Sequence, residues 1–311
     1  MPYHRRRATS PSPHPSRPQT REGAGAMNDQ RIAVITDSGT DVDATFARAH
    51  DVRVVPLRII YSDGSTFQSG VDISPDEVVR RLAEEIPTTS LPSPKQIQAT
   101  IEQARDDGYQ SAVVVTIASA LSATNQTAHM VAESMDFPVT VVDTKSIGMM
   151  AGFVVERAVE MIEAGVPYEE LGDRLADVAE KTDVFFAVKS LEYLYKGGRI
   201  NKHIYRIGSM LNIKPVLTCD EGGYYVMAKK ARGWEKALST MVELCAEKAG
   251  RYERCHIGLC ASINTKDLLD DLETRIREKV PNVASVQRYE LSADLLVHTG
   301  PDLVGMGAQE A

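Results

Sequence analysis

Apolar runs alternate with segments of helical periodicity along the first half of the chain. Strands buried on both faces are near-continuous apolar runs that end in turn residues, and four such runs occur, at residues 32–37, 52–61, 111–117 and 139–143. Between them, helical spacing and capping boxes at Ser74 and Ser93 predict helices. The predicted helices cover residues 44–50, 75–85, 94 to the glycine at 108, 122–134 and 148–164.

The second half of the chain has a different order of predicted strands and helices. Predicted strands at 215–219 and 224–230 flank the turn at Gly222 and Gly223, which indicates an antiparallel hairpin. Further strands are predicted at 184–188, 255–262 and 284–291, and helices at 168–181, 201–211, 234–249 and 265–279. The predicted fold class is α/β with two domains. A mostly parallel sheet with helices on both faces occupies 28–165, and an α+β domain with a mixed sheet occupies 166–311.

The first 27 residues differ from the rest. They are rich in Pro, Ser and Arg and nearly free of large aliphatic side chains, which predicts a disordered tail. Residues 1–26 hold five Arg and one Glu, so they contribute +4 and leave −12 on the remaining chain out of a net −8. One interpretation is that translation starts at Met27; the other is a basic tail that contacts acidic partners.

Composition narrows the class of protein. Hydrophobic residues make up 43% and charged residues 25% of 311 positions, as in ordinary globular proteins. The acidic body argues against nucleic acid as a partner. The longest apolar run, residues 147–155, is about half of what a membrane-spanning helix needs. Four irregularly spaced cysteines are typical of reduced thiols and predict a cytoplasmic protein.

Two hydroxyl-rich turns are the candidates for chemistry. One runs from Thr89 to Ser93, and the other from Ser119 to Asn125. Each precedes a predicted helix, and helix N-termini offer free N–H groups and partial positive charge. Two such turns side by side are suited to one carboxylate or phosphate. The competing interpretation is that Ser93 and Ser122 only cap their helices.

Seven short motifs, in this order, resemble the DegV family of bacterial fatty-acid-binding proteins. They are TDSGTD at 36–41, TSLPS at 89–93, SALSAT at 119–124, VVDT at 141–144, LYKGGRI at 194–200, KPVL at 214–217 and HTGP at 298–301. The resemblance runs from about Arg31 to Gly307. It implies a two-domain α/β protein that binds a long-chain fatty acid, such as palmitate, as its ligand and that needs no cofactor.

The resemblance also implies residues and a partner. The family's carboxylate-binding Thr and Ser correspond to Thr89 and Ser122, and Ser119, Asn125 and His298 are predicted to join them. The implied partner is a fatty acid kinase with a dihydroxyacetone-kinase-like domain, which phosphorylates the bound acid for phospholipid synthesis. The chain is then a carrier and not itself an enzyme.

Two residues depart from the family pattern. Ala123 replaces the usual Gly and adds a methyl group near the carboxylate. Asp302 follows HTGP where Gly or Asn is usual, and its charge brings the role of His298 into question.

A fatty acid needs an apolar tunnel. About 14 buried methylenes contribute on the order of 11 kcal/mol before ordering costs, in a pocket of roughly 300–1,000 Å³. The candidate walls are residues 147–155 and a helix with Ile204, Ile207 and Leu211, although plain core is the default for such residues.

Other clusters are open to two interpretations. Arg199 and Lys202 belong to a basic cluster that is either a solvated face or a contact for the kinase or, transiently, an anionic membrane. Asp37, Asp41 and Asp43 fail the EF-hand order, so no metal is predicted and they are expected to cap helices or shape the cleft.

The alternative function is a hydrolase or phosphotransferase acting on a small anionic substrate, with Ser122 as nucleophile and His298 as base. The chain has no nucleotide loop or nucleophile elbow.

Overall fold

The first sheet is parallel and has helices on both faces, as predicted. The computed structural model describes residues 25–208 and 210–311, so all but the last three residues of the predicted tail lie outside them. The sheet has the order β2-β1-β6-β7, with all three pairings parallel. Its strands are β1 (Ile32–Asp37), β2 (Arg53–Val55), β6 (Ser111–Thr116) and β7 (Val139–Asp143).

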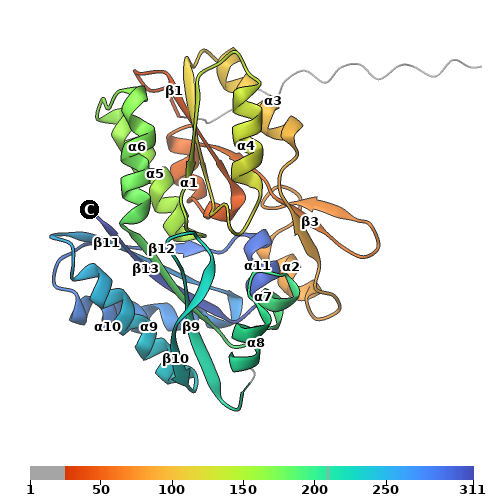
Figure 1. The fold of residues 1–311 in the computed structure, drawn as a ribbon, viewed down its shortest axis with the longest axis vertical. Helices are drawn as coiled ribbons and strands as arrows, with labels where there is room; N and C mark the ends of the chain where they lie inside the picture. Colours follow the sequence, from red (N-terminus) through yellow and green to blue (C-terminus); the bar gives the residue numbers. More distant parts are fainter. Residues whose placement is uncertain (1–24, 209) are drawn as a thin grey trace, which may run out of the picture.

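Alternate side chains of the central strands enter two separate cores. Ile32 and Val34 pack with α5 (Met149–Glu163) and α6 (Tyr168–Glu180), whereas Ala33 and Ile35 pack with α3 (Pro94–Asp106) and α4 (Thr124–Glu133). This period of two is what a strand buried on both faces requires. Figure 1 shows these helix pairs on either side of the sheet, and α1 (Ala44–Ala49) lies between β1 and β2 in the chain.

The predicted strand at 52–61 is wrong as a single element. It divides at Pro56 into β2 and β3 (Arg58–Ile60), which belong to different sheets, because proline removes a backbone donor. Strand β3 lies between β4 (Thr66–Gln68) and β5 (Thr88–Ser90) in a small antiparallel sheet. Helix α2 (Pro75–Arg81) connects β4 to β5 and is capped by Ser74 as predicted. Thr89 therefore lies on a strand, opposite Ile59.

The second sheet is mixed and has the order β10-β9-β8-β13-β11-β12. The predicted hairpin is confirmed by the antiparallel pairing of β9 (Ile213–Cys219) with β10 (Tyr225–Arg232). Strand β13 (Leu303–Glu310) was not predicted, although it lies between β8 (Thr182–Val188) and β11 (Cys255–Ala261). Strand β12 (Val283–Glu290) pairs parallel to β11 at the edge.

Helices cover this sheet differently on its two faces. One face packs on α9 (Trp234–Ala249) and α10 (Leu269–Lys279), which follows the short 3-10 helix η2 (Ile263–Leu268). The other face shares a core with the start of α5, the small sheet and α11 (Ala293–Thr299), another element that was not predicted. Figure 1 shows α11 and α2 beside β3, so segments distant in sequence meet there. The domain boundary near residue 165 stays a prediction.

Two short helices follow β8. They are α7 (Glu192–Lys196) and α8 (Lys202–Gly208), and α8 is shorter than the predicted 201–211. Ile204 is buried in the core shared with α11, but Leu211 is 91% exposed and is no cavity wall. In the described part of the chain, no helix is both long and apolar enough to cross a membrane.

Candidate functional site

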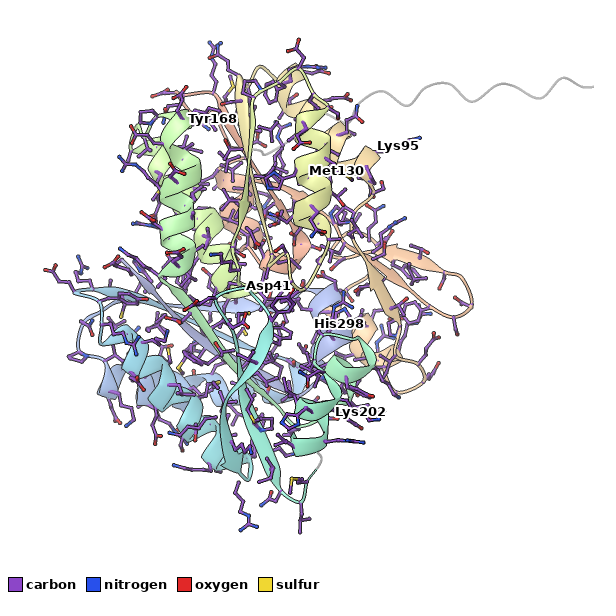
Figure 2. The ribbon with its side chains drawn as sticks, in the orientation of Figure 1. Asp41, Lys95, Met130, Tyr168, Lys202 and His298 are labelled. Atoms are coloured by element: carbon purple, nitrogen blue, oxygen red, sulfur yellow. The ribbon has the colours of Figure 1, made fainter. Side chains whose placement is uncertain are left out.

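A hydrogen bond joins Thr89 to His298. The Thr89 hydroxyl oxygen lies 2.7 Å from Nε2 of His298, although 209 positions separate the two residues. Strand β5 carries Thr89 and helix α11 carries His298, and these two elements pack together. Figure 2 shows His298 between the small sheet and α7. The structure thus brings together two of the predicted carboxylate-binding residues.

The His298 imidazole is held neutral. Burial, and secondly the charge of Arg199, lowers its pKa to about 3. Nδ1 is buried without a hydrogen-bond partner, and Gly197 packs against it so closely that a β-carbon there would be 2.2 Å away. A neutral imidazole held in this way can donate or accept one hydrogen bond through Nε2 toward a carboxylate or its acid.

The turn at 119–125 has its own hydrogen bonds. The Ser122 hydroxyl lies 2.8 Å from the Thr124 hydroxyl and accepts from the Thr124 amide at 3.3 Å. Helix α4 begins two residues later than predicted, so Ala123, not Ser122, is its N-cap, and Ala123 makes no side-chain cap bond. Ser93, in contrast, forms the predicted capping box with Gln96.

Two other predicted residues shape this turn. The Asn125 amide donates to the Thr116 hydroxyl at 3.0 Å and is buried, and the Ser119 backbone N–H donates to Asp143 at 3.1 Å. Neither contact involves Thr89 or His298. Their part in carboxylate binding, like that of Ser122, stays a prediction.

Arg199 and Lys202 have different environments. Arg199 is partly buried and donates to the Leu121 carbonyl at 3.3 Å through Nε and to the Gly197 carbonyl at 2.6 Å through Nη1. Burial lowers the pKa of its guanidinium. Lys202 begins α8 and is exposed. Arg199 therefore links the 119–125 turn to the glycine turn beside His298, whereas Lys202 faces solvent, where Figure 2 labels it.

An apolar cavity lies beside helix α11. Helix α11 contributes Leu295 and Thr299 to its wall, on either side of His298 in the sequence. The other lining residues come from six further segments: Ile147, Gly148, Met149, Val184, Phe186, Tyr225, Cys260, Leu291, Leu303 and Gly305. Its volume is about 30 Å³, much less than the volume predicted for a tunnel, because these side chains pack against one another. The segment 147–155 supplies wall residues as predicted, and the α8 helix does not.

The unusual Asp302 is neutralised locally. Its carboxylate lies 3.1 Å from the Lys189 ammonium, and the Asn264 side chain donates to it at 3.4 Å. The concern that its charge opposes an anionic ligand at His298 is therefore reduced by this ion pair.

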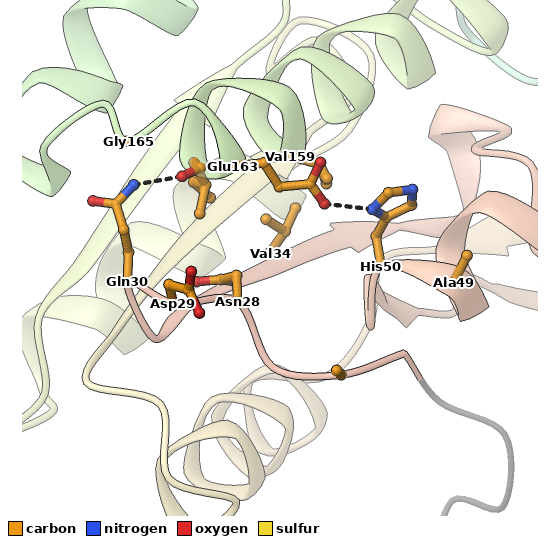
Figure 3. Close-up of a pocket in the computed structure, with 11 residues that line it drawn as sticks. Asn28, Asp29, Gln30, Val34, Ala49, His50, Val159, Glu163 and Gly165 are labelled. Atoms are coloured by element: carbon orange, nitrogen blue, oxygen red, sulfur yellow. Dashed lines mark hydrogen bonds and ion pairs between the residues drawn. The ribbon is translucent and has the colours of Figure 1, made fainter.

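Larger hollows lie elsewhere. A cleft of about 700 Å³ is bounded by loops around Asp41 and Ser69 and by the end of β12. Another, of about 420 Å³, lies where β1 begins and is shown in Figure 3, with the His50–Glu163 contact of 2.7 Å on one side. Neither is lined by a predicted carboxylate-binding residue. The described residues contain no group of three His, Cys, Asp or Glu side chains arranged for a metal ion.

Sequence reasoning missed three residues in or next to the site. Tyr225 lines the cavity, and its pKa is raised well above the usual value by burial. Gly197 was noted only as part of the LYKGGRI motif. Asp294 is buried one helical turn before His298, and an acid in the first turn of an unpredicted helix gave no signal. Finding them required knowledge of which segments meet in space.

The contacts of Ser122 and His298 do not assemble the alternative function, a hydrolase. A nucleophile must lie within hydrogen-bond reach of its base. The His298 Nε2 atom lies against Thr89, whereas Ser122 lies against Thr124. A serine–histidine pair of the expected kind is therefore absent from these contacts.

The fold and site define a class: an α/β protein with two main sheets and a small third one, in which the helix that carries the His of a neutral His–Thr pair also lines an apolar cavity. The chain belongs to the DegV family, because residues 31–311 match the family described as "Uncharacterised protein, DegV family". A DegV domain-containing protein from Clostridium acetobutylicum is 34% identical over 280 residues, which cover 89% of this chain and 98% of that protein. Another, from Clostridium perfringens, is 32% identical over 90% of this chain and 99% of its own length.

A solved structure from Thermus thermophilus has a similar fold. It is described as showing fatty acid binding of a DegV family protein, and it is 31% identical with a TM-score of 0.84. The match covers 90% of this chain and all of that one. The fold predicted from the sequence is confirmed by this likeness.

Proposed function

We propose that this protein binds one long-chain fatty acid, such as palmitate, with its carboxylate at the Thr89–His298 pair. The observation that carries the proposal is the position of that pair: α11 presents His298 to Thr89 and presents Leu295 and Thr299 to the apolar cavity. A polar group and an apolar wall on one helix suit a molecule with a carboxylate head and a hydrocarbon tail. The fatty-acid-binding relative from Thermus thermophilus supports the same ligand.

The remaining predicted residues complete the head-group site in this proposal. Ser122 lies on the turn that Arg199 holds through the Leu121 carbonyl, and Ser119 and Asn125 belong to the same turn. Hydroxyl donors and a guanidinium stabilise a carboxylate better than hydroxyls alone. In this proposal Arg199 therefore lies beside the ligand and is not a surface contact for a partner.

Entry of an acyl chain requires the cavity to widen. A 16-carbon chain contributes about 11 kcal/mol of transfer free energy, which offsets the cost of moving side chains apart. Met149 and Leu295 line the wall, and methionine adapts to irregular space because it is unbranched and flexible.

The proposed role is that of a carrier. In this proposal the chain works in the cytoplasm and presents the carboxyl group to an ATP-dependent fatty acid kinase with a dihydroxyacetone-kinase-like domain. The acyl phosphate then enters phospholipid synthesis. Lys202 and the other exposed basic residues of α8 are the proposed contact for that kinase, with transient contact to an anionic membrane surface as the second use.

Native mass spectrometry of freshly purified protein tests the ligand. An added mass of about 250–300 Da, the size that the burial estimate implies, is expected on the wild-type chain. Thr89→Ala and Ser122→Ala are each expected to weaken retention by about 1–3 kcal/mol, the scale of a hydrogen bond to a charged group. Thr88→Ala, at the exposed neighbouring position of β5, is the matched control. If wild type and the three variants retain the acyl chain equally, Thr89 and Ser122 do not bind the carboxylate.

A further inference from the structure

Two buried aspartates fasten the helix that carries His298. Asp41 follows the 3-10 turn η1 (Ser38–Thr40), and its Oδ1 accepts a 2.8 Å hydrogen bond from the Ser292 backbone N–H. Asp294, in the first turn of α11, accepts from the Ser38 hydroxyl at 3.0 Å. Asp41 belongs to the η1 loop and Asp294 to helix α11, and each accepts a hydrogen bond from the other segment. The loop and the helix are therefore joined by two reciprocal hydrogen bonds.

Further hydrogen bonds extend this contact to the small sheet. The Ser38 hydroxyl also accepts from the Leu57 N–H at 3.0 Å, next to the start of β3. The Asp294 N–H donates to the Ser69 hydroxyl at 3.1 Å, just after β4. The sheet that carries Thr89 and the helix that carries His298 thus meet at one polar cluster.

The position of Asp294 makes the cluster relevant to the ligand site. Residues four apart on a helix lie on the same face, one turn from each other, and Asp294 and His298 have this spacing. Leu295 and Thr299, on the same short helix, line the cavity. Displacing the first turn of α11 therefore displaces both the imidazole and the cavity wall.

The two carboxyl groups are buried without a cation. Asp41 is 8% and Asp294 1% exposed, and neither has an ion pair among the residues that the structure describes. The Oδ2 atoms of both have no hydrogen-bond partner. A buried, unpaired carboxylate is costly, and the group takes up a proton instead. Burial raises the pKa of both residues, and mutual repulsion with each other and with Asp37 raises the pKa of Asp41 further.

In the described part of the chain, no lysine or arginine forms an ion pair with either carboxyl group at this contact. Cys260 and Tyr225 face Asp41 from the cavity, and the open cleft on the other side is lined by Asp43, Arg48, Asp51, Arg288 and Glu290. On the helices packed against α11, Arg80 pairs with Glu77, Arg81 stacks on Tyr61, and Lys196 pairs with Glu192.

We propose that Asp41 and Asp294 are positioning residues, which hold α11 as uncharged carboxylic acids and so place His298 against Thr89. This role rests on the proposed function for its effect on the ligand. Loss of the protons puts two like charges in one buried contact, so the first turn of α11 separates from the η1 loop. The His298–Thr89 pair then opens, and affinity for the fatty acid falls as pH rises.

Conservative variants distinguish this role from simple packing. Asparagine keeps the size and the accepting oxygen but cannot ionise, and it tolerates the left-handed backbone of Asp41, whose φ is 49°. Asp294→Asn and Asp41→Asn are expected to bind palmitate within about threefold of wild type near pH 6, and Asp294→Ala about tenfold more weakly.

The pH profile is the decisive measurement. Wild-type affinity for palmitate, measured from about pH 6 to about pH 9, is expected to fall at least about tenfold more than that of either asparagine variant. The palmitate carboxyl titrates equally in every sample, so it cancels in the ratio of variant to wild type. Asp43→Asn, in the same loop but exposed, is expected to follow the wild-type profile. Parallel profiles for wild type and Asp294→Asn would overturn the proposal.

A second readout needs no ligand. The Leu296 and Gly300 amides donate along α11 to the carbonyls of Ser292 and Leu296, at 3.2 and 2.8 Å. After correction for intrinsic exchange, their hydrogen-exchange protection is expected to fall with pH in wild type and to stay level in Asp294→Asn. Level protection in both proteins refutes the positioning role. Failure of the wild type to bind palmitate at any pH refutes the proposed function instead.

Discussion

Gly197 lies against His298, with room for no side chain between them. A β-carbon at residue 197 would come within 2.2 Å of the imidazole Nδ1 and 3.0 Å of the Tyr193 carbonyl. The ring orientation that brings Nε2 to Thr89 therefore depends on a residue without a side chain. The sequence shows this Gly-Gly pair only as part of the LYKGGRI motif. In the structure, close packing requires glycine at 197, whereas a positive φ favours it at 198.

Gly197→Ala is expected to weaken fatty-acid binding by about 1–3 kcal/mol, because the ring must move and the Thr89 hydrogen bond is lost. Isothermal titration with palmitate measures this. Gly198→Ala is the matched control: its φ is +74°, so alanine strains the backbone, but nothing lies within 4 Å of the added carbon. The control is expected to lower the melting temperature and to leave affinity nearly unchanged. The opposite ranking of the two affinities would contradict the role assigned to Gly197.

The Glu156 carboxyl is expected to make stability depend on pH. It is buried on α5 and accepts a 2.7 Å hydrogen bond from Tyr289 of β12. Burial, partly offset by that bond, raises its pKa from 4.5 to about 7. The folded state thus favours the protonated form, and its contribution to stability is complete below about pH 4.5 and lost as pH rises through about 7.

Glu156→Gln removes this titration and retains the size of the side chain. Its free energy of unfolding, measured by urea at several pH values, is expected to decline less between about pH 4.5 and 7 than that of wild type. The difference is on the order of 3 kcal/mol at most. Glu169→Gln, at an exposed position of α6, serves as the control and is expected to decline as wild type does. If the free energy of unfolding of Glu156→Gln declines with pH as steeply as that of wild type, Glu156 is already ionised in the folded protein.

Local patterns predicted most of the fold, and the misses have physical reasons. Strands β1, β6 and β7 of the first sheet and helix α9 follow from apolar runs and periodicity. Strand β13 was not predicted because Gly305 and Gly307 interrupt its apolar pattern. Glycine is disfavoured in strands unless neighbouring atoms pack closely against the backbone. The break at Pro56 was not predicted because one continuous apolar run supplies strands to two different sheets.

The site was predicted in part for a similar reason. Thr89 and His298 were chosen on a resemblance of motifs, and the structure adds their contact. Arg199 was interpreted either as part of a solvated face or as a contact for a kinase or membrane, and only the tertiary structure shows it reaching the Leu121 carbonyl. Partners 78 to 251 positions apart, such as Arg199 and Leu121 or Asp41 and Ser292, leave no local pattern.

Gly307→Ala is expected to destabilise the protein strongly. An added β-carbon would lie 2.4 Å from the Asp183 carbonyl on β8 and 2.4 Å from Cγ of Met150 on α5. Because β13 is central in its sheet, the backbone has little room to shift, and overpacking of this kind costs about 1–3 kcal/mol or more. Thermal unfolding measures it. Gly250→Ala, whose nearest neighbour would be 3.3 Å away at the end of α9, is expected to change stability little. Equal melting temperatures for the two variants would contradict this packing of β13.

Arg199→Ala is expected to weaken palmitate binding, whereas Lys202→Ala is not. Arg199 holds the carbonyls of Leu121 and Gly197, which belong to the two turns that flank the proposed carboxylate position. Removing it leaves the Ser122 turn unsupported and takes away a positive charge beside His298, so a loss of about 1–3 kcal/mol is expected.

Arg199→Lys separates these two effects. Lysine keeps the charge but cannot match the planar fork that spans both carbonyls, so affinity is expected to fall between wild type and Arg199→Ala. Lys202 is exposed and makes no such bridge, so its variant is expected to bind palmitate as wild type does and to reduce phosphorylation in the presence of a fatty acid kinase. Titration with palmitate and a coupled kinase assay measure the two properties. If Arg199→Ala binds palmitate like wild type and loses only the kinase reaction, Arg199 belongs to the partner surface and the turn is held without it.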